Sequence, residues 1–276
     1  MARSLFAIGH WISKPQKLQL SWRRYQSSTT NAKHIDEQSD FLRHFIRKNK
    51  PPQSTLDYFA SQPWASKILD DNAYEPVPVW SRHINEQTGE NRFFAKTVNT
   101  DTTVPHILAL NLKDLRTPEP TDFLQKDEPA PTSLSDVASH ELIFLMALGE
   151  DLQAHPSIVH GGFQAIIFDE IMRLLILLHQ NNICKPGPRD IHYTASMTVS
   201  YSAPVIAPSN VFVRARLVRR EGRKWFTKGE IVNTEGQILT NAESMWITAK
   251  LVGRSWDWTT GRRVGVGGAA GDISVK

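Results

Sequence analysis

An acidic side chain inside an apolar stretch is the feature of this sequence with the clearest potential for chemistry. Asp169 follows Ile167 and Phe168 and stands three residues before Met172. A carboxylate in apolar surroundings costs on the order of several kcal/mol unless it is paired or hydrogen-bonded. Chains rarely keep that cost without a use, so Asp169 is a candidate base or nucleophile. Glu170 points about 100° further round a helix, and we expect it to reach solvent instead.

A second candidate group, His160-Gly161-Gly162, stands upstream, where an extended segment is predicted to turn into a helix. The two glycines let the backbone approach a ligand closely, and the first amides of a helix are free to donate hydrogen bonds. A carbonyl oxygen bound there would be polarised, as in an oxyanion hole. The helix rises about 10 Å from Gly162 to Asp169. We therefore expect the carboxylate to come from the second chain of a dimer.

The elements that must position these groups are predicted most firmly in the C-terminal half. Residues 163–179 read as a helix that is apolar on nearly every side, which predicts burial on nearly every side. Four strands are predicted after it, at residues 195–202, 211–218, 225–233 and 238–249. Glycine-containing turns at 221–223 and 234–236 join the last three. A buried helix followed by an antiparallel meander predicts a sheet curled around a central helix.

The N-terminal half carries weaker patterns. Apolar residues at helical spacing predict a first helix that begins at Ser39 and ends before Pro51. Further predictions are helical turns at 55–60 and 64–69, strands at 92–97 and 103–112, a mobile surface loop at 115–136, and an apolar run of ambiguous type at 141–148. Pro105 lacks a backbone donor, so its strand should lie at an edge or begin after that residue. The helical stretch is predicted to pack on the main domain, with a partner-binding surface as the alternative.

The positive charge is concentrated at the N-terminus. The whole chain has a net charge of +4, but residues 1–25 hold five Lys and Arg residues, and no acid appears before Asp36. Without those five charges the remainder is at about −1, so the folded part lacks the basic surface that nucleic-acid binding requires. A basic segment rich in Ser and Leu resembles a mitochondrial transit peptide. Cleavage after Arg23-Arg24-Tyr25 would leave Gln26 as the first mature residue, whereas a merely flexible basic N-terminus is the alternative.

Several site classes find no support in the sequence. Cys184 is the single cysteine, which rules out an internal disulfide and a cysteine-based zinc cluster. The longest apolar stretch outside the N-terminal segment, near Ile171–Leu178, is far short of the ~20 residues that span a bilayer. We predict no membrane span, no metal and no cofactor.

The spacing of these residues resembles that of a known family. His160-Gly161-Gly162 followed by Asp169 is similar to the HGG-x6-D signature of the PaaI-like hotdog thioesterases. Thr194 before a strand, Tyr201-Ser202-Ala203-Pro204 and the Gly222-Arg223-Lys224 turn extend the resemblance. It covers roughly residues 141–249, and more loosely the strands from residue 92 on.

The resemblance implies an α+β hotdog fold, in which a curved antiparallel sheet wraps around a long central helix. It also implies a dimer, or a dimer of dimers, with sites at the interface, and hydrolysis of acyl-CoA thioesters. The predicted transit peptide would place this activity in the mitochondrial matrix. Asp169 would be the nucleophile or the base toward water, and Thr194 would help hold that water. The amide of Gly161 or Gly162 would polarise the thioester carbonyl from the opposite subunit, with His160 orienting the loop.

Some positions depart from the family pattern. Ala154 stands where many relatives have Asn or Gln, with Gln153 one position away. Arg173 follows Asp169 by one helical turn, so the two could form an ion pair that keeps the carboxylate ionised or masks it. A masked carboxylate would favour a non-catalytic hotdog scaffold or acyl-binding protein. A hotdog hydratase or dehydratase that pairs His155 with Asp169 is a further alternative.

A basic cluster surrounds one predicted hairpin: Arg216, Arg219, Arg220, Arg223 and Lys224. These side chains could bind the phosphates of CoA, which favour Arg and Lys, or they could form a solvated basic turn. Trp225 and Phe226 beside them are interpreted as packing residues without a stacking role.

The predicted organisation has four parts: a transit peptide at 1–25, a helical N-terminal extension at 26–90, a hotdog thioesterase domain at 91–252 and a flexible tail at 253–276.

Overall fold

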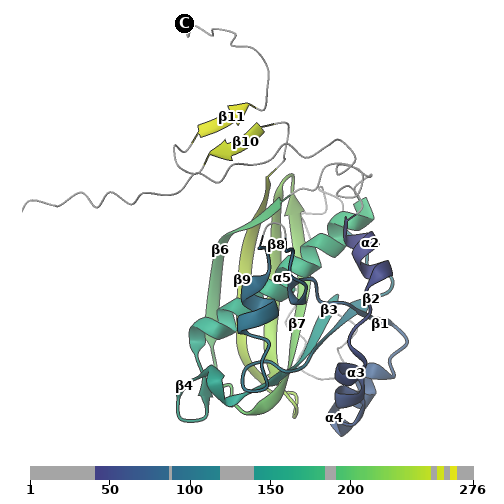
Figure 1. The fold of residues 1–276 in the computed structure, drawn as a ribbon, viewed down its shortest axis with the longest axis vertical. Coiled ribbons are helices and arrows are strands. Elements are labelled where there is room, and N and C mark those ends of the chain that lie inside the picture. Colours follow the sequence, from purple (N-terminus) through teal and green to yellow (C-terminus); the bar gives the residue numbers. More distant parts are fainter. Residues whose placement is uncertain are drawn as a thin grey trace, which may run out of the picture.

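A single antiparallel sheet of seven strands dominates the computed structural model (Figure 1). The structure describes residues 41–86, 89–118, 140–183 and 191–249, and the backbone of residues 254–257 and 262–265. In spatial order the strands of the sheet are β1 (Tyr74–Val77), β2 (Ile107–Leu112), β3 (Leu142–Leu148), β7 (Ser209–Glu221), β8 (Lys224–Asn233), β9 (Ile238–Ala249) and β6 (Ile191–Tyr201). Two small ribbons, β4 (Gln153–His155) with β5 (Ile158–Val159) and β10 (Arg254–Asp257) with β11 (Arg262–Gly265), stand apart from it.

Several predictions fall where the structure gives no description. The predictions that lie outside the described residues are the transit peptide, the cleavage site at Gln26, most of the loop at 115–136, Cys184 and most of the predicted tail.

One helix of 23 residues, α5 (Gly161–Ile183), packs against one face of the sheet. Its contacts reach β3, β6, β7, β8 and β9. Close approach depends on Gly229 of β8, where a Cβ atom would stand 2.9 Å from Met172 Cε and 3.2 Å from Phe168 Cδ1. Ala215 and Ala242 flank Gly229 on the neighbouring strands. The helix α5 packs against the sheet at this row of small residues.

The N-terminal segment covers both faces of the sheet. α2 (Phe41–Lys48) places Leu42 and Phe45 in the core that contains α5. α3 (Gln53–Ala60) and α4 (Pro63–Leu69) pack in a second core on the opposite face, against Leu108 of β2, Leu145 of β3 and Phe212 of β7. β3 is buried at every position because apolar layers cover both of its faces. The ambiguous run at 141–148 is therefore a strand.

Two predictions upstream of the sheet need correction. Residues 92–97 form a π-helical turn, η2 (Phe93–Thr97), and not a strand. The guanidinium of Arg82 donates hydrogen bonds to the carbonyls of Phe94 and Val98, both at 3.0 Å. These bonds from a residue outside the turn stabilise its helical conformation. β1 was not predicted, and it joins the sheet beside β2 from within the segment interpreted as a helical extension. Pro76 suits this short edge strand because proline is tolerated at sheet edges.

The four strands predicted after α5 are present. β7, β8 and β9 form the expected meander. β6, whose partner was not predicted, lies at the far edge and pairs with β9. β2 begins at Ile107, after Pro105, and it is not an edge strand.

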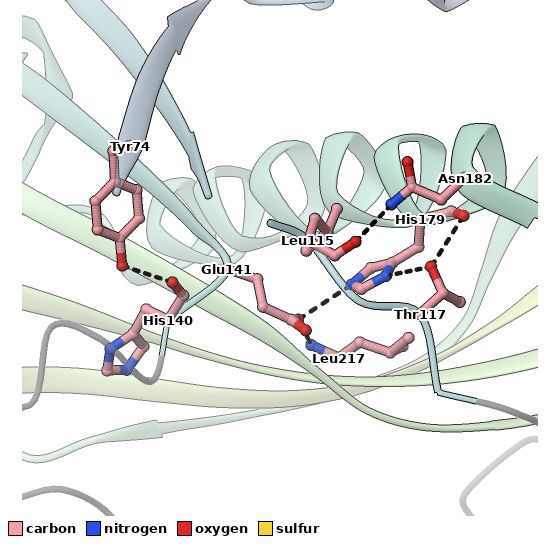
Figure 2. A network of polar contacts seen from close by, with 8 residues as sticks. All are labelled: Tyr74, Leu115, Thr117, His140, Glu141, His179, Asn182 and Leu217. Atoms are coloured by element: carbon pink, nitrogen blue, oxygen red, sulfur yellow. Dashed lines mark hydrogen bonds and ion pairs between the residues drawn. The ribbon is translucent and has the colours of Figure 1, made fainter. Parts of the chain in front are cut away.

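A polar network anchors the second half of α5 to the sheet (Figure 2). His179 is fully buried and contacts the Glu141 carboxylate through Nε2 at 3.1 Å and the Thr117 hydroxyl through Nδ1 at 3.0 Å. The same carboxylate accepts the backbone N–H of Leu217 in β7. Asn182 donates to the carbonyl of Leu115 at 2.9 Å. These bonds join α5 to the segment that precedes residue 119 and to the segment that follows residue 139.

Within the described residues, no helix has both the length and the apolar character needed to cross a membrane.

Candidate active site

The carboxylate of Asp169 meets the edge strand of the sheet. Thr194 of β6 donates its hydroxyl hydrogen bond to Asp169 Oδ1 at 2.5 Å. Both side chains are partly open to solvent in the single chain. The expectation that Asp169 is enclosed by apolar side chains is therefore wrong for one chain. The reason is that β6 is the last strand of the sheet, so no further strand covers this side of α5.

A bulge in β6 sets the direction of the Thr194 side chain. Thr194 pairs with Trp246 of β9, whereas Ser196 pairs with Met245, so Ala195 is an extra residue in the ladder. A β-bulge shifts the alternation of side chains by one position.

Glu170 is half-buried, as Asp169 is, so the expectation that it reaches solvent more readily than Asp169 is not confirmed. Burial raises the pKa of its carboxyl group, while a hydrogen bond from Ser81 and the charges of Arg173 and Arg82 act in the opposite direction. Ser81 and Arg82 belong to the turn η1 (Trp80–Arg82), which lies over this side of α5. The sequence around α5 contained no sign of this cover, because the covering residues lie some ninety positions upstream.

Arg173 does not pair with Asp169. Its Nη2 atom donates to Glu90 Oε1 at 3.0 Å, in an ion pair that is about three-quarters buried on both sides. The Asp169–Arg173 ion pair considered from the sequence is therefore wrong, and Arg173 does not mask the candidate carboxylate. Glu90 and Ser81 are the residues near the site that sequence analysis missed.

The His160-Gly161-Gly162 turn begins α5 as predicted. The Gly162 N–H donates to Nδ1 of its neighbour His160 at 2.9 Å. Tyr201, at the end of β6, donates its hydroxyl hydrogen bond to the Gly161 carbonyl at 3.0 Å. Among the described residues, the Gly161 N–H has no hydrogen-bond acceptor. The free amide at the start of the helix is therefore that of Gly161.

The residues just upstream have structural partners. Gln153 donates to the Ala207 carbonyl at 2.8 Å and accepts from the Ser157 N–H at 3.1 Å, which ties down the β4–β5 ribbon. Ala154 is the bulged residue of that ribbon. His155 is exposed on β4, and the single chain does not join it to Asp169, which bonds to Thr194 instead.

The basic hairpin between β7 and β8 lies at the level of Thr194. Thr194, Trp246, Trp225 and Arg220 are successive partners across β6, β9, β8 and β7. Three strand spacings separate Thr194 from Arg220, or about 14 Å. Arg223 and Lys224 are exposed at the hairpin end, while Arg216 is partly buried further along β7.

The hairpin arginines are partly held by their neighbours. Arg220 lies over the Trp225 ring at 4.7 Å, and Arg219 lies over the Phe226 ring at 3.7 Å. Trp225 and Phe226 therefore do stack, on arginines of their own chain. Arg223 Nη1 approaches the Thr248 carbonyl at 3.4 Å. The described residues contain no group of three or more His, Cys, Asp or Glu side chains that could hold a metal ion.

Comparison with known families covers the same part of the chain. Residues 157–240, which include the helix start, Asp169, Thr194 and Tyr201, match the family model of the Thioesterase superfamily. The chain carries a thioesterase-superfamily domain. This match confirms the thioesterase resemblance drawn from the sequence, and it supports thioesterase-type activity in general terms. The α+β architecture of an antiparallel sheet and a helix is likewise confirmed.

Two curated proteins resemble parts of this chain. The uncharacterized mitochondrial membrane protein FMP10 of Saccharomyces cerevisiae is 29% identical over 97 residues, which are 35% of this chain and 37% of the yeast protein. The match thus spans little more than a third of that relative. Verlamelin biosynthesis protein B of a Lecanicillium species is 23% identical over 217 residues, which are 71% of this chain and 88% of the relative.

The solved structures that are similar to part of this chain include the following three. A hypothetical thioesterase with coenzyme A from Streptococcus pneumoniae is 13% identical, with a TM-score of 0.35, over 40% of this chain and 80% of its own. The PaaI protein of E. coli is 13% identical, with a TM-score of 0.35, over 40% and 72%. Mouse thioesterase superfamily member 2 is 18% identical, with a TM-score of 0.33, over 40% and 80%.

Proposed function

We propose that the protein is an acyl-CoA thioesterase that acts as a homodimer of hotdog domains. In this reaction water attacks the thioester carbonyl carbon, the carbon–sulfur bond breaks, and the products are a free acid and CoA as its thiol. Asp169 accepts the proton of the attacking water, or attacks the carbonyl itself before water releases the acid. The superfamily match over the residues of the site supports this assignment.

The observation that carries the proposal is the hydrogen bond between Thr194 and Asp169. It leaves Asp169 Oδ2 without a bond to any described residue, so that oxygen is available to a water or a carbonyl carbon. The Thr194 hydroxyl orients the carboxylate and stands close enough to contact the same water. A carboxylate held by one oxygen and open at the other is suited to the role of base or nucleophile.

The amide of Gly161 is the proposed oxyanion donor. The Gly162 N–H already has an acceptor in His160, whereas the Gly161 N–H points away from the helix without one among the described residues. The positive end of the helix dipole adds to its effect on a carbonyl oxygen. His160 thus acts as an orienting residue.

The geometry favours sites built from two chains. The helix rises about 12 Å over the eight residues from Gly161 to Asp169, which is too far for one thioester carbon to be served by both groups of one chain. β6 is an edge strand of 11 residues whose sequence contains no proline, Lys, Arg, Asp or Glu. Edge strands without such protection are prone to pair with another chain. Pairing of β6 with its copy would bring each Asp169 toward the partner's helix start.

The basic hairpin is the proposed contact for the phosphates of CoA. Arg220, Arg223 and Lys224 lie at the end of the sheet that Thr194 occupies, and Arg216 lies further along β7. A distance of about 14 Å from Thr194 to Arg220 is compatible with a pantetheine arm running from the phosphates to the thioester.

We place the protein in mitochondria, in the matrix. The basic N-terminal segment and the partial similarity to a yeast protein with a mitochondrial name support this placement. Sequencing of the N-terminus of protein isolated from its native cells should find a chain that begins near Gln26. An intact Met1 would count against import with cleavage.

The catalytic proposal is tested by Asp169→Asn in the full chain. We expect kcat for release of free CoA thiol from a panel of acyl-CoAs to fall at least about 100-fold, because the amide cannot accept a proton from water. Asp57→Asn on α3, where the carboxylate only accepts a surface hydrogen bond from Gln53, is the matched control. Circular dichroism and sedimentation should show an unchanged fold and dimer.

Unchanged turnover in Asp169→Asn would remove this residue from the mechanism. A wild-type protein that binds acyl-CoA but releases no thiol at any chain length would favour the second candidate function, a non-catalytic acyl-binding protein. Ala154, which replaces a polar residue common in relatives, is the feature that favours this second candidate.

A further inference from the structure

Two side chains hold opposite ends of one peptide group at the start of α5. The Gly161 carbonyl accepts from the Tyr201 hydroxyl at 3.0 Å, and the Gly162 N–H donates to His160 Nδ1 at 2.9 Å. These two atoms belong to the same planar peptide unit. Fixing both its carbonyl oxygen and its N–H fixes the orientation of the whole plane.

This clamp matters because the plane lies between two glycines. Glycine rotates more freely than any other residue, so an unclamped Gly161-Gly162 turn would sample many orientations of its amides. The Tyr201 ring also approaches Gly161 closely, since a Cβ atom on Gly161 would stand 3.3 Å from the hydroxyl oxygen and 3.4 Å from Cε1. The Gly161 N–H, the proposed oxyanion donor, belongs to the preceding peptide unit, whose His160 carbonyl accepts from the N–H groups of Phe163 and Gln164. The Cα atom of Gly161 joins that unit to the clamped plane.

The bulge in β6 allows the same strand to support the carboxylate as well. Thr194 and Tyr201 are seven positions apart, so in a regular strand their side chains would point to opposite faces. With the extra residue Ala195, their partners on β9 are Trp246 and Thr240, which are six positions apart and share a face. Thr194 and Tyr201 both contact α5, one at Asp169 and the other at Gly161.

We infer that Tyr201 is a positioning residue that holds the start of α5, and with it the Gly161 amide, in place by clamping the Gly161–Gly162 peptide. One bulged strand, β6, thereby supports the carboxylate of one site of the proposed dimer and the amide of the other. This inference rests on the proposed function for its kinetic effect, but the clamp is a property of the chain whether or not it is an enzyme.

Tyr201→Phe in the full chain removes only the hydroxyl. The Tyr201 side chain is 55% exposed, so its hydroxyl contributes little to burial and the variant should fold. Tyr58→Phe is the matched control, because its hydroxyl donates an equivalent hydrogen bond to Asn210 Oδ1 at 3.0 Å on α3. Both variants should unfold at nearly the wild-type temperature.

The kinetic readout separates positioning from binding. We expect kcat for acyl-CoA hydrolysis to fall about tenfold in Tyr201→Phe, less than the loss of an oxyanion donor itself, with KM within twofold of the wild-type value. The reason is that the hydroxyl bonds to the Gly161 carbonyl and positions the helix start that carries the donor. Tyr58→Phe should leave both constants unchanged. An equal kcat in Tyr201→Phe and wild type would overturn the positioning role.

A second readout does not depend on activity. In the full chain labelled with ¹⁵N-glycine, the Gly162 amide should exchange its proton at least threefold faster in Tyr201→Phe than in wild type or Tyr58→Phe, and the Gly161 resonance should shift. Unaltered exchange and shifts would show that Tyr201 does not clamp this peptide. If the wild-type enzyme proves inactive while these changes occur, the proposed function fails and the clamp stands.

Discussion

At the scale of single residues, two adjacent carboxyl groups have different surroundings because different parts of the chain cover them. Asp169 faces β6, where the sheet ends, and bonds to Thr194. Glu170 faces the η1 turn and bonds to Ser81. The helix sequence alone predicted that Glu170 reaches solvent more readily than Asp169, whereas both are half-buried in the single chain. Helical geometry gives the angle between the side chains of Asp169 and Glu170. It does not show which other segment of the chain covers each side chain.

The raised pKa of the half-buried Glu170 carboxyl group predicts a dependence of stability on pH. Burial raises the pKa of Glu170 in the folded state, so the folded chain binds this proton more tightly than the unfolded chain does. The free energy of unfolding must then fall as pH rises through the interval from the ordinary pKa to the raised one. Glu170→Gln should therefore melt at a higher temperature than wild type at pH 7, and near the wild-type temperature at pH 3.5.

Thermal melts followed by circular dichroism at both pH values test this. Glu243→Gln, at an exposed carboxylate paired with Lys228, is the control and should show no such difference. A Glu170→Gln variant less stable than wild type at pH 7 would mean that its contacts with Ser81, Arg82 and Arg173 outweigh the cost of burial.

At the scale of elements, β6 contacts Asp169 through Thr194 and the start of α5 through Tyr201, and it offers a free edge for the dimer. Its inner edge pairs with β9 over the whole strand. Most of its side chains are exposed in the single chain, including Tyr193 at 43% and Tyr201 at 55%. Sequence periodicity located the strand, but it could not show that the strand pairs with β9 at the edge of the sheet.

A charge placed on this edge should disrupt the proposed dimer. In a two-fold pairing of β6 strands, Thr198→Lys would bring like charges close together, and like charges opposed across strands are destabilising. We expect sedimentation equilibrium at micromolar concentration to show a monomer. Ser54→Lys on α3 adds the same charge to another exposed hydroxyl position and should leave the dimer intact. A dimer that persists in Thr198→Lys would place the interface elsewhere.

At the scale of the whole molecule, the N-terminal segment is part of the packed structure. β1 extends the sheet, α2 contacts α5, and α3 with α4 cover the opposite face. Glu90 and Ser81 contact the helix that carries Asp169. The boundary proposed at residue 90 therefore separates two sequence regions that share both apolar cores.

A chain shortened to residues 91–276 should not form a stable fold. The loss of Phe59 and Ala65 would expose Leu108, Leu145 and Phe212 on the outer face, and exposed apolar patches of that kind favour aggregation. Circular dichroism and sedimentation should show an aggregated or non-cooperatively unfolding product. A chain that begins at residue 36 keeps all of these elements and is the control. Cooperative unfolding of the shorter chain at the wild-type temperature would instead support an independent domain.

The sequence by itself determined the elements whose signals are local. The apolar run of α5 follows from side chains within one segment, and the β7–β8–β9 meander follows from strand patterns and from turns at Gly222 and Gly236, both of which have positive φ. The pairing of a glycine-rich helix start with a carboxylate at fixed spacing was likewise visible in the sequence, as was Thr194.

Only the tertiary structure decided the features that depend on distant residues. The π-helical turn at 93–97 is held by Arg82, Glu170 is partly covered by η1, and Arg173 pairs with Glu90. Each of these outcomes is set by a long-range neighbour whose position emerges when the chain folds. Local periodicity carries no information about that neighbour, because it records what one segment prefers and not what covers it.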